Sequence, residues 1–310
     1  MGGRSPRVIL ALLAVAACSR EPRLSPASGS QRAASSAASA PRLARAAPPL
    51  ASAPARPDAG VALSVERALG APGDALGATL YRYAARETHG QLWVARALPA
   101  KTRFELIPAP RPRPLARITA AHEPAGDFAS INGGFYEQNR PMGLVLAGGK
   151  ELAPLSPRGG SGVFGVEAGV PFVVHRDDYQ ARSPSVALQS IDRLVDAGEV
   201  LVRPRPDLPR DARSALAITA DGAVLLVIAF DARAAFPTSD TVIRLTPAST
   251  STGPTLLEFA EWLAGELGAR YALNLDGGFS TAMRLRIGGE RHEVIAHRAT
   301  INALVASARP

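Results

Sequence analysis

The segment Tyr271-Ala-Leu-Asn-Leu-Asp-Gly-Gly-Phe-Ser-Thr281 is the most informative part of the chain. Its apolar first half, residues 271–275, has the length of a buried strand. Asp276 and the pair Gly277-Gly278 follow directly, and glycine at a strand end permits a tight turn or a close approach of the backbone to a ligand. We therefore expect a packed strand to hold the Asp276 carboxylate at the edge of a cavity. For this segment alone, a purely structural Asp-Gly turn remains an alternative.

A second segment, Phe128-Ala-Ser-Ile-Asn-Gly-Gly-Phe-Tyr136, has the same order of residue types. An apolar run precedes Asn132, and Gly133-Gly134 and two aromatic residues follow it. Two strand ends of this kind in one chain predict that the two glycine-containing loops meet and form the floor of one site.

The N-terminal residues have the features of an export signal. Arg4 and Arg7 precede an apolar run that is too short to span a bilayer, so residues 1–17 are typical of a secretory signal peptide. The sequence Val15-Ala-Ala-Cys18 resembles a bacterial lipobox, and it predicts a lipid on Cys18 that anchors the chain to the cell envelope, at the outer membrane. An ordinary signal peptide with an incidental cysteine is the alternative. Because the chain has one cysteine, it cannot form an internal disulfide.

Residues 18–60 consist mainly of Ala, Pro, Ser and Arg, with few large apolar side chains. Such a segment buries too little surface to offset its ordering entropy, so we expect a flexible tether. Residues 1–60 contain eight Arg and two acidic residues, which accounts for +6 of the formal net charge of +8. The remaining +2 on residues 61–310 gives no reason to expect a nucleic-acid partner.

Residues 61–310 have the length of one domain, and strand patterns dominate them. Asp221-Gly222 between two apolar runs is the strongest hairpin signal. A strand is also expected at residues 301–305. The expected hairpins pair Leu80–Ala84 with Gln91–Ala95, Gly162–Val166 with Pro171–His175, and Ser214–Ala220 with Ala223–Phe230.

Helical signals are fewer. Thr255-Leu-Leu-Glu258 is a capping box at the start of an apolar pattern with helical spacing. A weaker helix is expected at Ala187–Ala197, and the proline-rich passages Pro108–Pro114 and Pro204–Pro209 are expected to be surface loops. The fold class predicted is α+β: a single domain of mixed, largely antiparallel β-sheet with a few packed helices.

Several kinds of site are disfavoured. Gly160–Gly165 formally matches G-x-G-x-x-G, but Pro157 precedes it and strand residues follow, so a structural role is favoured. No G-x-S-x-G nucleophile elbow occurs, and the five histidines lack the spacing of zinc ligands. We therefore expect neither a metal nor a cofactor.

Charged residues at strand ends are the remaining candidates. Asp231 directly follows an apolar strand, Arg213 directly precedes one, and Arg298 lies just before the last. An arginine at a strand end is commonly a solvated surface charge. In a cleft, however, the guanidinium group matches phosphate in a bidentate manner and stays protonated.

Five segments of the chain occur in a characteristic order: Ile131-Asn-Gly-Gly-Phe-Tyr136, Pro141-Met-Gly143, Arg213-Ser-Ala215, Asp221-Gly222 and Asn274-Leu-Asp-Gly-Gly-Phe-Ser-Thr281. Taken together, these segments resemble the phosphodiester glycosidase domain, and the resemblance covers residues 78–308. The chain departs from the family at Asp231-Ala-Arg233, where relatives commonly have Asp-Gly-Arg, and in an inserted loop, residues 234–251.

The resemblance implies an enzyme that removes a sugar from a phosphodiester at the anomeric carbon and leaves a phosphomonoester. Asp276 would be the key carboxylate, and Asp231 would be a second one. The substrate would be a glycan or glycosyl phosphate of the envelope, including an α-linked GlcNAc-1-phosphate unit. The alternative is a non-catalytic glycan-binding envelope lipoprotein with a role in exopolysaccharide handling. The other residues implied are Arg213 and Arg298 for phosphate, Asn132 and Asn274 as polar contacts, and Gly133, Gly134, Gly277, Gly278, Ser280 and Thr281 around the substrate.

Overall fold

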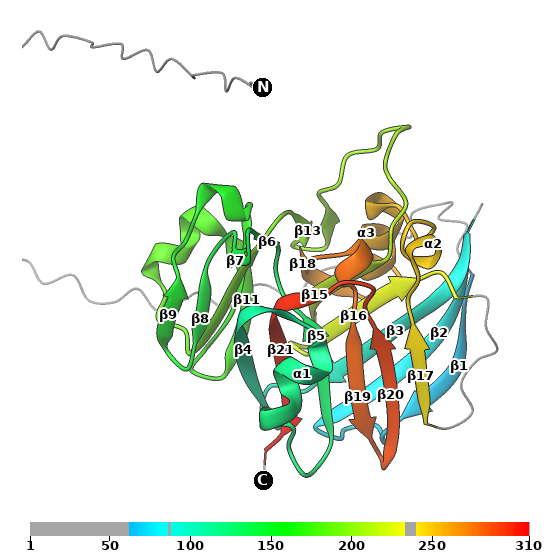
Figure 1. Cartoon of the computed structure of the whole chain (residues 1–310), viewed down its shortest axis with the longest axis horizontal. Coiled ribbons are helices and arrows are strands. Elements are labelled where there is room, and N and C mark those ends of the chain that lie inside the picture. Colours follow the sequence, from blue (N-terminus) through cyan, green and yellow to red (C-terminus); the bar gives the residue numbers. More distant parts are fainter. Residues whose placement is uncertain (1–61, 86–87, 233–239, 310) are drawn as a thin grey trace, which may run out of the picture. The chain divides into compact units, whose positions relative to one another are not determined.

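The computed structural model describes residues 62–85, 88–232 and 240–309, which all belong to one compact unit, residues 55–310. The expected signal peptide, the Cys18 anchor and the tether lie outside the described residues. β-Structure dominates the described part, as three large sheets and a two-stranded ribbon with a few short helices (Figure 1). The largely antiparallel sheets agree with the prediction, whereas the helical share is smaller than an α+β label suggests. No helix in the described ranges has the length and apolar character needed to cross a membrane.

The largest sheet has eight strands, and each neighbouring pair in it is antiparallel. The predicted hairpins over residues 80–95 and 214–230 both occur in it, and β3 extends the first of them back to Thr88. The strands, in spatial order, are β1 (Ala62–Leu69), β2 (Leu76–Ala85), β3 (Thr88–Ala97), β16 (Val224–Phe230), β15 (Arg213–Thr219), β18 (Ala269–Asn274), β13 (Arg193–Asp196) and β14 (Glu199–Val200).

Strand β16 is apolar throughout because both faces of this sheet are covered. Leu226 and Ile228 contribute to the core shared with the other sheets, whereas Leu225 and Val227 lie on the opposite face with α3 (Leu256–Ala264). Successive side chains of a strand point to opposite faces, so a strand buried on both faces shows no polar alternation.

The second sheet has six strands and is antiparallel except for the parallel pair β17–β20. The expected loop at Pro108–Pro114 is largely part of β4 instead. β4 is an edge strand of this sheet, where a proline that lacks an N–H is tolerated. The strands, in spatial order, are β17 (Thr241–Arg244), β20 (Glu290–Ile295), β19 (Met283–Ile287), β5 (Phe128–Asn132), β21 (Thr300–Ala308) and β4 (Thr102–Arg113).

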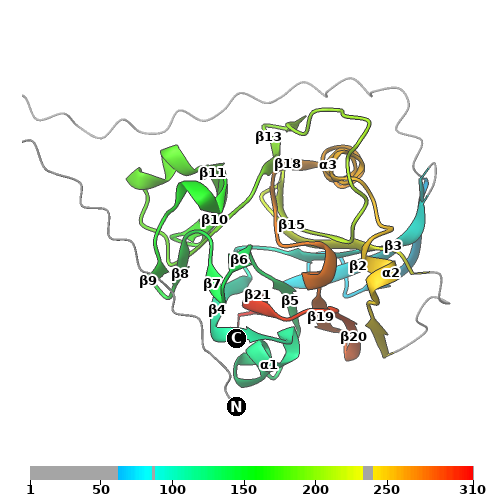
Figure 2. The same cartoon turned by 45° about the horizontal axis from the view of Figure 1, so that its top comes forward.

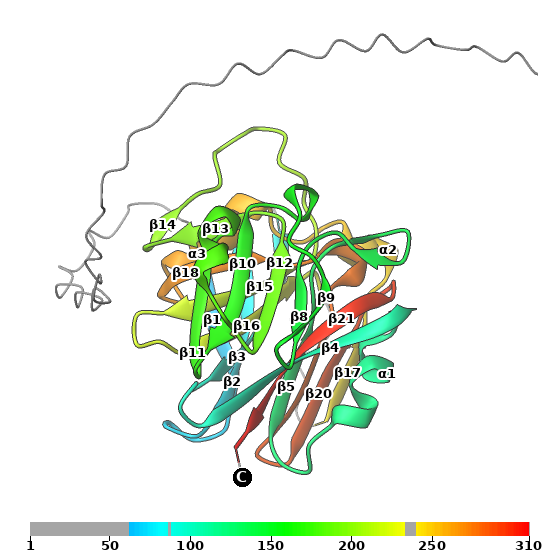
Figure 3. The same cartoon turned by 90° about the vertical axis from the view of Figure 1, so that its left-hand side faces the viewer.

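The third sheet has five antiparallel strands and faces the viewer in Figure 3. The predicted helix at Ala187–Ala197 is wrong, because this stretch supplies β12 and β13, with Asp192 at a φ of 63° between them. Short apolar runs do not distinguish helix from strand by spacing alone, and pairing with β10 and β18 decides the outcome. The strands are β11 (Val170–His175), β10 (Gly162–Glu167), β12 (Val186–Ser190), β8 (Val145–Ala147) and β9 (Lys150–Ala153).

Helix α3 begins at the predicted capping box, in which Thr255 and Glu258 each cap the other's backbone N–H. It packs against β13, β14 and β18, and Figure 2 views it nearly end-on. Part of the expected inserted loop 234–251 is ordered structure, because it contains β17 and a short helix. The remaining elements are α1 (Leu115–Thr119), α2 (Pro247–Thr250), the ribbon strands β6 (Tyr136–Glu137) and β7 (Arg140–Pro141), and 3-10 turns at Ala120–His122, Pro157–Gly159, Arg176–Ala181 and Gly278–Ser280.

Candidate active site

The two glycine-containing loops lie side by side, as the sequence predicts. One follows β5 of the six-stranded sheet, and the other follows β18 of the eight-stranded sheet. The backbone N–H of Asp276 donates to the carbonyl oxygen of Gly133 at 3.1 Å. The side-chain amide of Asn132 donates to the carbonyl oxygen of Asp276 at 2.6 Å. Two segments that are 144 positions apart along the chain therefore form one connected unit.

Asn132 itself is fully buried and holds the two sheets together. Its Oδ1 accepts hydrogen bonds from the Ser214 hydroxyl at 2.9 Å and from the Ala282 N–H at 3.1 Å. With its amide committed to Asp276, the side chain is satisfied within the protein. It does not line the cavity described below, so its position suits a structural clamp and not the expected polar contact with substrate.

The glycines after Asn132 are required by packing. A Cβ at Gly133 would lie 1.5 Å from Oδ1 of Asn302, and a Cβ at Gly134 would lie 2.8 Å from the carbonyl oxygen of Gln189. Asn302 binds this loop through two oxygens. Its backbone carbonyl oxygen accepts from the Gly133 N–H at 2.9 Å, and its Oδ1 accepts from the Gly134 N–H at 3.2 Å. No local pattern in the sequence marks Asn302, because its partners lie in the loop after β5, 168 positions away for Gly134.

A polar cavity of about 520 Å³ opens where β15 begins and β18 ends. The sequence-predicted residues Asp276, Arg213 and Arg298 all line it, together with Asn274 and Ser280. Asn132, Gly133, Gly134, Thr281 and Asp231 are not among its lining residues. The rest of the lining consists of Phe135, Tyr136, Asp211, Leu275, Gly277, Gly278 and Phe279.

Burial is the main influence on the Asp276 carboxyl and raises its pKa to about 6. The Ser280 hydroxyl, the Gly277 N–H and the charge of Arg298 act in the opposite direction, because each stabilises the ionised form. A carboxyl group whose pKa lies near neutrality, in a cavity with arginines, is typical of a functional site.

Arg213 is held rigidly at the start of β15. Its Nε donates to the carbonyl oxygen of Pro254 at 3.1 Å, and Nη2 donates to that of Pro209 at 2.5 Å. Nη1 makes no hydrogen bond to the described residues, and the side chain lines the cavity. Burial lowers the pKa of Arg213, but Asp211 opposes this effect. The side chain can therefore present a fixed cationic N–H donor to an anion.

Arg298 lies at the exposed rim of the cavity. Its guanidinium carbon is 4.6 Å from the centroid of the Phe279 ring, and its backbone N–H donates to the Phe279 carbonyl at 2.7 Å. On the same side, the Tyr136 hydroxyl donates to the carbonyl oxygen of Ala299 at 2.9 Å. Burial raises the pKa of Tyr136, and the negative charge of Asp276 adds to this increase. The rim thus combines a cation with aromatic rings.

Asn274 and the residues after Asp276 shape the floor. The Asn274 side chain is 6% exposed, lines the cavity and makes no hydrogen bond to the described residues. Gly277 packs on the backbone of Ala212, where a Cβ would lie 2.8 Å from the carbonyl oxygen. Gly278 has a φ of 55°, which favours glycine. Thr281 is buried, with a hydroxyl that has no partner in the described part of the chain.

Besides Asp276, the cavity is lined by a carboxylate other than the expected Asp231. Asp231 accepts a hydrogen bond from the Thr252 hydroxyl at 2.7 Å and does not line the cavity. Asp211 lines it instead, and burial raises the pKa of Asp211. Asp211 lies in an irregular segment before β15, so no strand pattern in the sequence singled it out; its position two residues before Arg213 was the available signal.

No cluster of three or more His, Cys, Asp or Glu side chains within residues 62–85, 88–232 and 240–309 is arranged to hold a metal ion.

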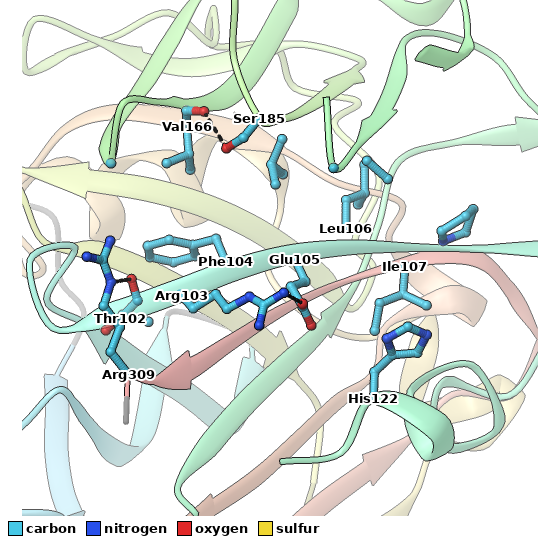
Figure 4. Close-up of a pocket in the computed structure, with 15 residues that line it drawn as sticks. Thr102, Arg103, Phe104, Glu105, Leu106, Ile107, His122, Val166, Ser185 and Arg309 are labelled. Atoms are coloured by element: carbon cyan, nitrogen blue, oxygen red, sulfur yellow. Dashed lines mark hydrogen bonds and ion pairs between the residues drawn. The ribbon is translucent and has the colours of Figure 1, made fainter. Parts of the chain in front are cut away.

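A second cavity, of about 450 Å³, lies between β4 and the five-stranded sheet (Figure 4). Its charged groups are already engaged, because Arg103 pairs with Glu105 at 2.5 Å and Arg309 donates to the Thr102 carbonyl at 3.1 Å. The cavity around Asp276 is therefore the stronger candidate for an active site.

Residues 126–308 match the family model of phosphodiester glycosidases, which is more than half of the chain. No curated protein shows significant similarity to the chain. Among solved structures, the zebrafish N-acetylglucosamine-1-phosphodiester alpha-N-acetylglucosaminidase catalytic domain, auto-inhibited by its pro-peptide, aligns at 13% identity with a TM-score of 0.54. The alignment covers 81% of this chain and 88% of that one. A hypothetical protein from Synechocystis aligns at 15% identity and a TM-score of 0.52, over 76% of this chain and 62% of that one.

Proposed function

Because the chain belongs to the phosphodiester glycosidase family, we propose that it hydrolyses the bond between the anomeric carbon of a sugar and a phosphodiester oxygen. The observation that carries this proposal is the cavity that brings the half-buried Asp276 carboxyl together with Arg213 and Arg298. A carboxylate beside fixed cations suits a reaction in which positive charge develops on a sugar and negative charge on a phosphate.

The phosphate would bind to the arginines. Arg213 offers Nη1 from a guanidinium group whose other nitrogens are fixed by Pro254 and Pro209. Arg298 supplies a second cation from the rim. As the bond to the anomeric carbon breaks, the phosphate oxygen gains charge, and these cations stabilise it. A phosphate departs as a stable anion, so a strong general acid is less necessary than for an alcohol leaving group.

The sugar would lie over Asp276 and Asn274. The ionised Asp276 carboxylate stabilises the oxocarbenium-like transition state. The buried Asn274 amide, which has no partner among the described residues, would hydrogen-bond to the sugar or to its substituent. The amide lines the cavity, where it can both donate and accept a hydrogen bond to a ligand. An N-acetylated sugar such as α-linked GlcNAc offers both a donor and an acceptor for this purpose.

A model glycosyl phosphodiester, assayed with the wild-type protein and with Asp276→Asn, tests the proposal. We expect sugar release by the wild type and a decrease of at least about 100-fold in kcat for the variant, in line with the effect of removing a preorganised charge. Asp207→Asn is a matched control, because Asp207 is exposed in the loop before β15. Full activity of Asp276→Asn would remove this residue from the catalytic role.

The same assay separates hydrolysis from the non-catalytic alternative. If the wild type released no sugar from several sugar-1-phosphodiesters but still bound them, glycan binding in exopolysaccharide handling would replace hydrolysis as the proposal. Binding of sugar phosphates is measured by calorimetry. A competing effect of inorganic phosphate on that binding would point to the arginines.

We also propose that the protein acts in the cell envelope, attached through a lipid on Cys18. The lipobox-like sequence before Cys18 supports this location. Mass spectrometry of the mature N-terminus tests it directly, because a lipidated cysteine adds the mass of the acyl chains. Cys18→Ala should move the protein from the membrane fraction to the aqueous fraction, and an unchanged distribution would contradict the anchor.

A further inference from the structure

Asp211 is a carboxylate in the cavity without a structural task. It is half-buried and lines the same space as Asp276. Its side chain makes no hydrogen bond or ion pair with the described residues, and only its backbone N–H is bonded, to the Pro254 carbonyl at 3.4 Å. Within the described part of the chain, its interaction is the charge attraction to Arg213, and both carboxylate oxygens remain free to accept a hydrogen bond from a ligand or water.

The other candidate for a second carboxylate is differently placed. Asp231 is bonded to the Thr252 hydroxyl and does not line the cavity. Of these two carboxylates, Asp211 is therefore the one that shares a cavity with Asp276.

Asp211, Asp276 and the Gly277-Gly278 pair all line the same cavity. β15 and β18 are antiparallel neighbours, with Ala215 opposite Asn274, so Asp211 and Asp276 extend from adjacent strand ends. The N–H of Gly278 donates to the Ala212 carbonyl at 2.6 Å. A Cβ at Gly278 would lie 3.5 Å from Oδ1 of Asp211, so the glycine leaves space beside that carboxylate.

We propose that Asp211 is the general base that activates the attacking water in the hydrolysis proposed above, on which this inference rests. The water oxygen forms a bond to the anomeric carbon, and its proton moves to the Asp211 carboxylate. The bond between the anomeric carbon and the phosphodiester oxygen breaks, and its electron pair stays on the phosphate. The products are a free sugar and a phosphomonoester dianion, and the proton on Asp211 passes to solvent.

The electrostatic surroundings agree with a base at this position. Burial raises the pKa of Asp211, and the cation of Arg213 opposes that rise, so the carboxylate is a stronger base than an exposed one. Arg213 is the charged group that acts on the pKa of Asp211, and Asp276 is the other carboxyl group that lines the same cavity.

Kinetics of Asp211→Asn on a model glycosyl phosphodiester, with Asp207→Asn as the control, test the role. We expect kcat to fall about 100- to 10,000-fold with a small change in KM, as for the loss of a general base. Azide is a nucleophile that can attack the anomeric carbon without losing a proton, so it does not need a general base. Added azide should therefore restore turnover of Asp211→Asn and yield a glycosyl azide. Azide should not restore the turnover of Asp276→Asn.

Each result decides the matter. An Asp211→Asn variant within about threefold of the wild type would overturn the inference and leave the proposed function intact. A large loss without azide rescue, or a loss confined to KM, would make Asp211 a binding residue and equally overturn it. An inactive wild type would remove the proposed function and this inference together. Thermal melting of Asp211→Asn and of Asp211→Ala checks folding, which should be retained because the Asp211 side chain has no bonds to lose.

Discussion

The side-chain amide of Asn132 donates a hydrogen bond to the backbone carbonyl of Asp276 at 2.6 Å and joins the ends of strands from two different sheets. This bond fixes the backbone that carries the candidate catalytic carboxylate, and the Ser214 hydroxyl and Ala282 N–H complete the arrangement. Several measurable consequences follow from this connection and from the burial of the carboxyl group that it positions.

Removal of the Asn132 side chain should destabilise the protein. Asn132→Ala leaves the Asp276 carbonyl, the Ser214 hydroxyl and the Ala282 N–H without a buried partner, and we expect a loss of about 3 kcal/mol in the free energy of unfolding. Chemical denaturation measures the change. A loss below about 1 kcal/mol would show that the clamp contributes little.

A methyl group at Gly133 should be poorly tolerated. Because a Cβ there would lie 1.5 Å from Oδ1 of Asn302, Gly133→Ala should cost about 3 kcal/mol or more through overpacking. Gly126→Ala is the matched control, since nothing lies within 4 Å of a Cβ at Gly126, and its effect should stay within about 0.5 kcal/mol. Equal stabilities of the two variants in thermal melting would contradict the packing argument.

Activity should depend on the ionisation of Asp276. With the pKa of Asp276 raised to about 6, the carboxylate forms as pH increases through that value, and kcat/KM should rise over the same range. The Ser280 hydroxyl stabilises the ionised form, so Ser280→Ala should move the midpoint to higher pH. The pH profile of sugar release measures both midpoints, and an unchanged midpoint in Ser280→Ala would contradict the assignment.

Asp276→Asn should change how stability depends on pH. A carboxyl whose pKa is raised by folding favours the native state only at low pH, because above pH 4 the unfolded chain ionises first and the native state must ionise a buried group. The wild type should therefore lose stability relative to the variant by about 1–3 kcal/mol between pH 4 and pH 7.5. Denaturation at the two pH values checks this, and a constant difference would refute it.

Arg213→Lys should weaken phosphate recognition although it retains the charge. A lysine presents its three donors from one nitrogen, so it does not reproduce the separate positions of Nε, Nη2 and Nη1 that reach Pro254, Pro209 and the cavity. We expect kcat/KM to fall about 10- to 100-fold, the equivalent of one charge-assisted hydrogen bond. Arg205→Lys, in the exposed loop before β15, is the control and should leave the rate unchanged. A wild-type rate in Arg213→Lys would show that the separate contacts of the guanidinium nitrogens are not needed for phosphate recognition.

Local chemistry in the sequence determined much of the fold. The hairpin at Asp221-Gly222 and the helix that begins at Thr255 follow from signals within a few residues, because turn and capping preferences depend on near neighbours. The two glycine-containing strand ends likewise indicated where the site lies. The sequence also placed Asp276, Arg213 and Arg298 at strand ends, and all three line the cavity.

Only the tertiary structure decided the roles of the remaining residues. Residues 187–197 form strands because β10 and β18 pair with them, and the spacing of apolar residues within the segment does not reveal such distant partners. For the same reason, no local pattern marks Asn132 as a clamp or Asn302 as its neighbour, and none indicates that Asp211 lines the cavity whereas Asp231 does not. The sequence fixes which groups are available, whereas burial and long-range pairing select which of them face the cavity and which hold it together.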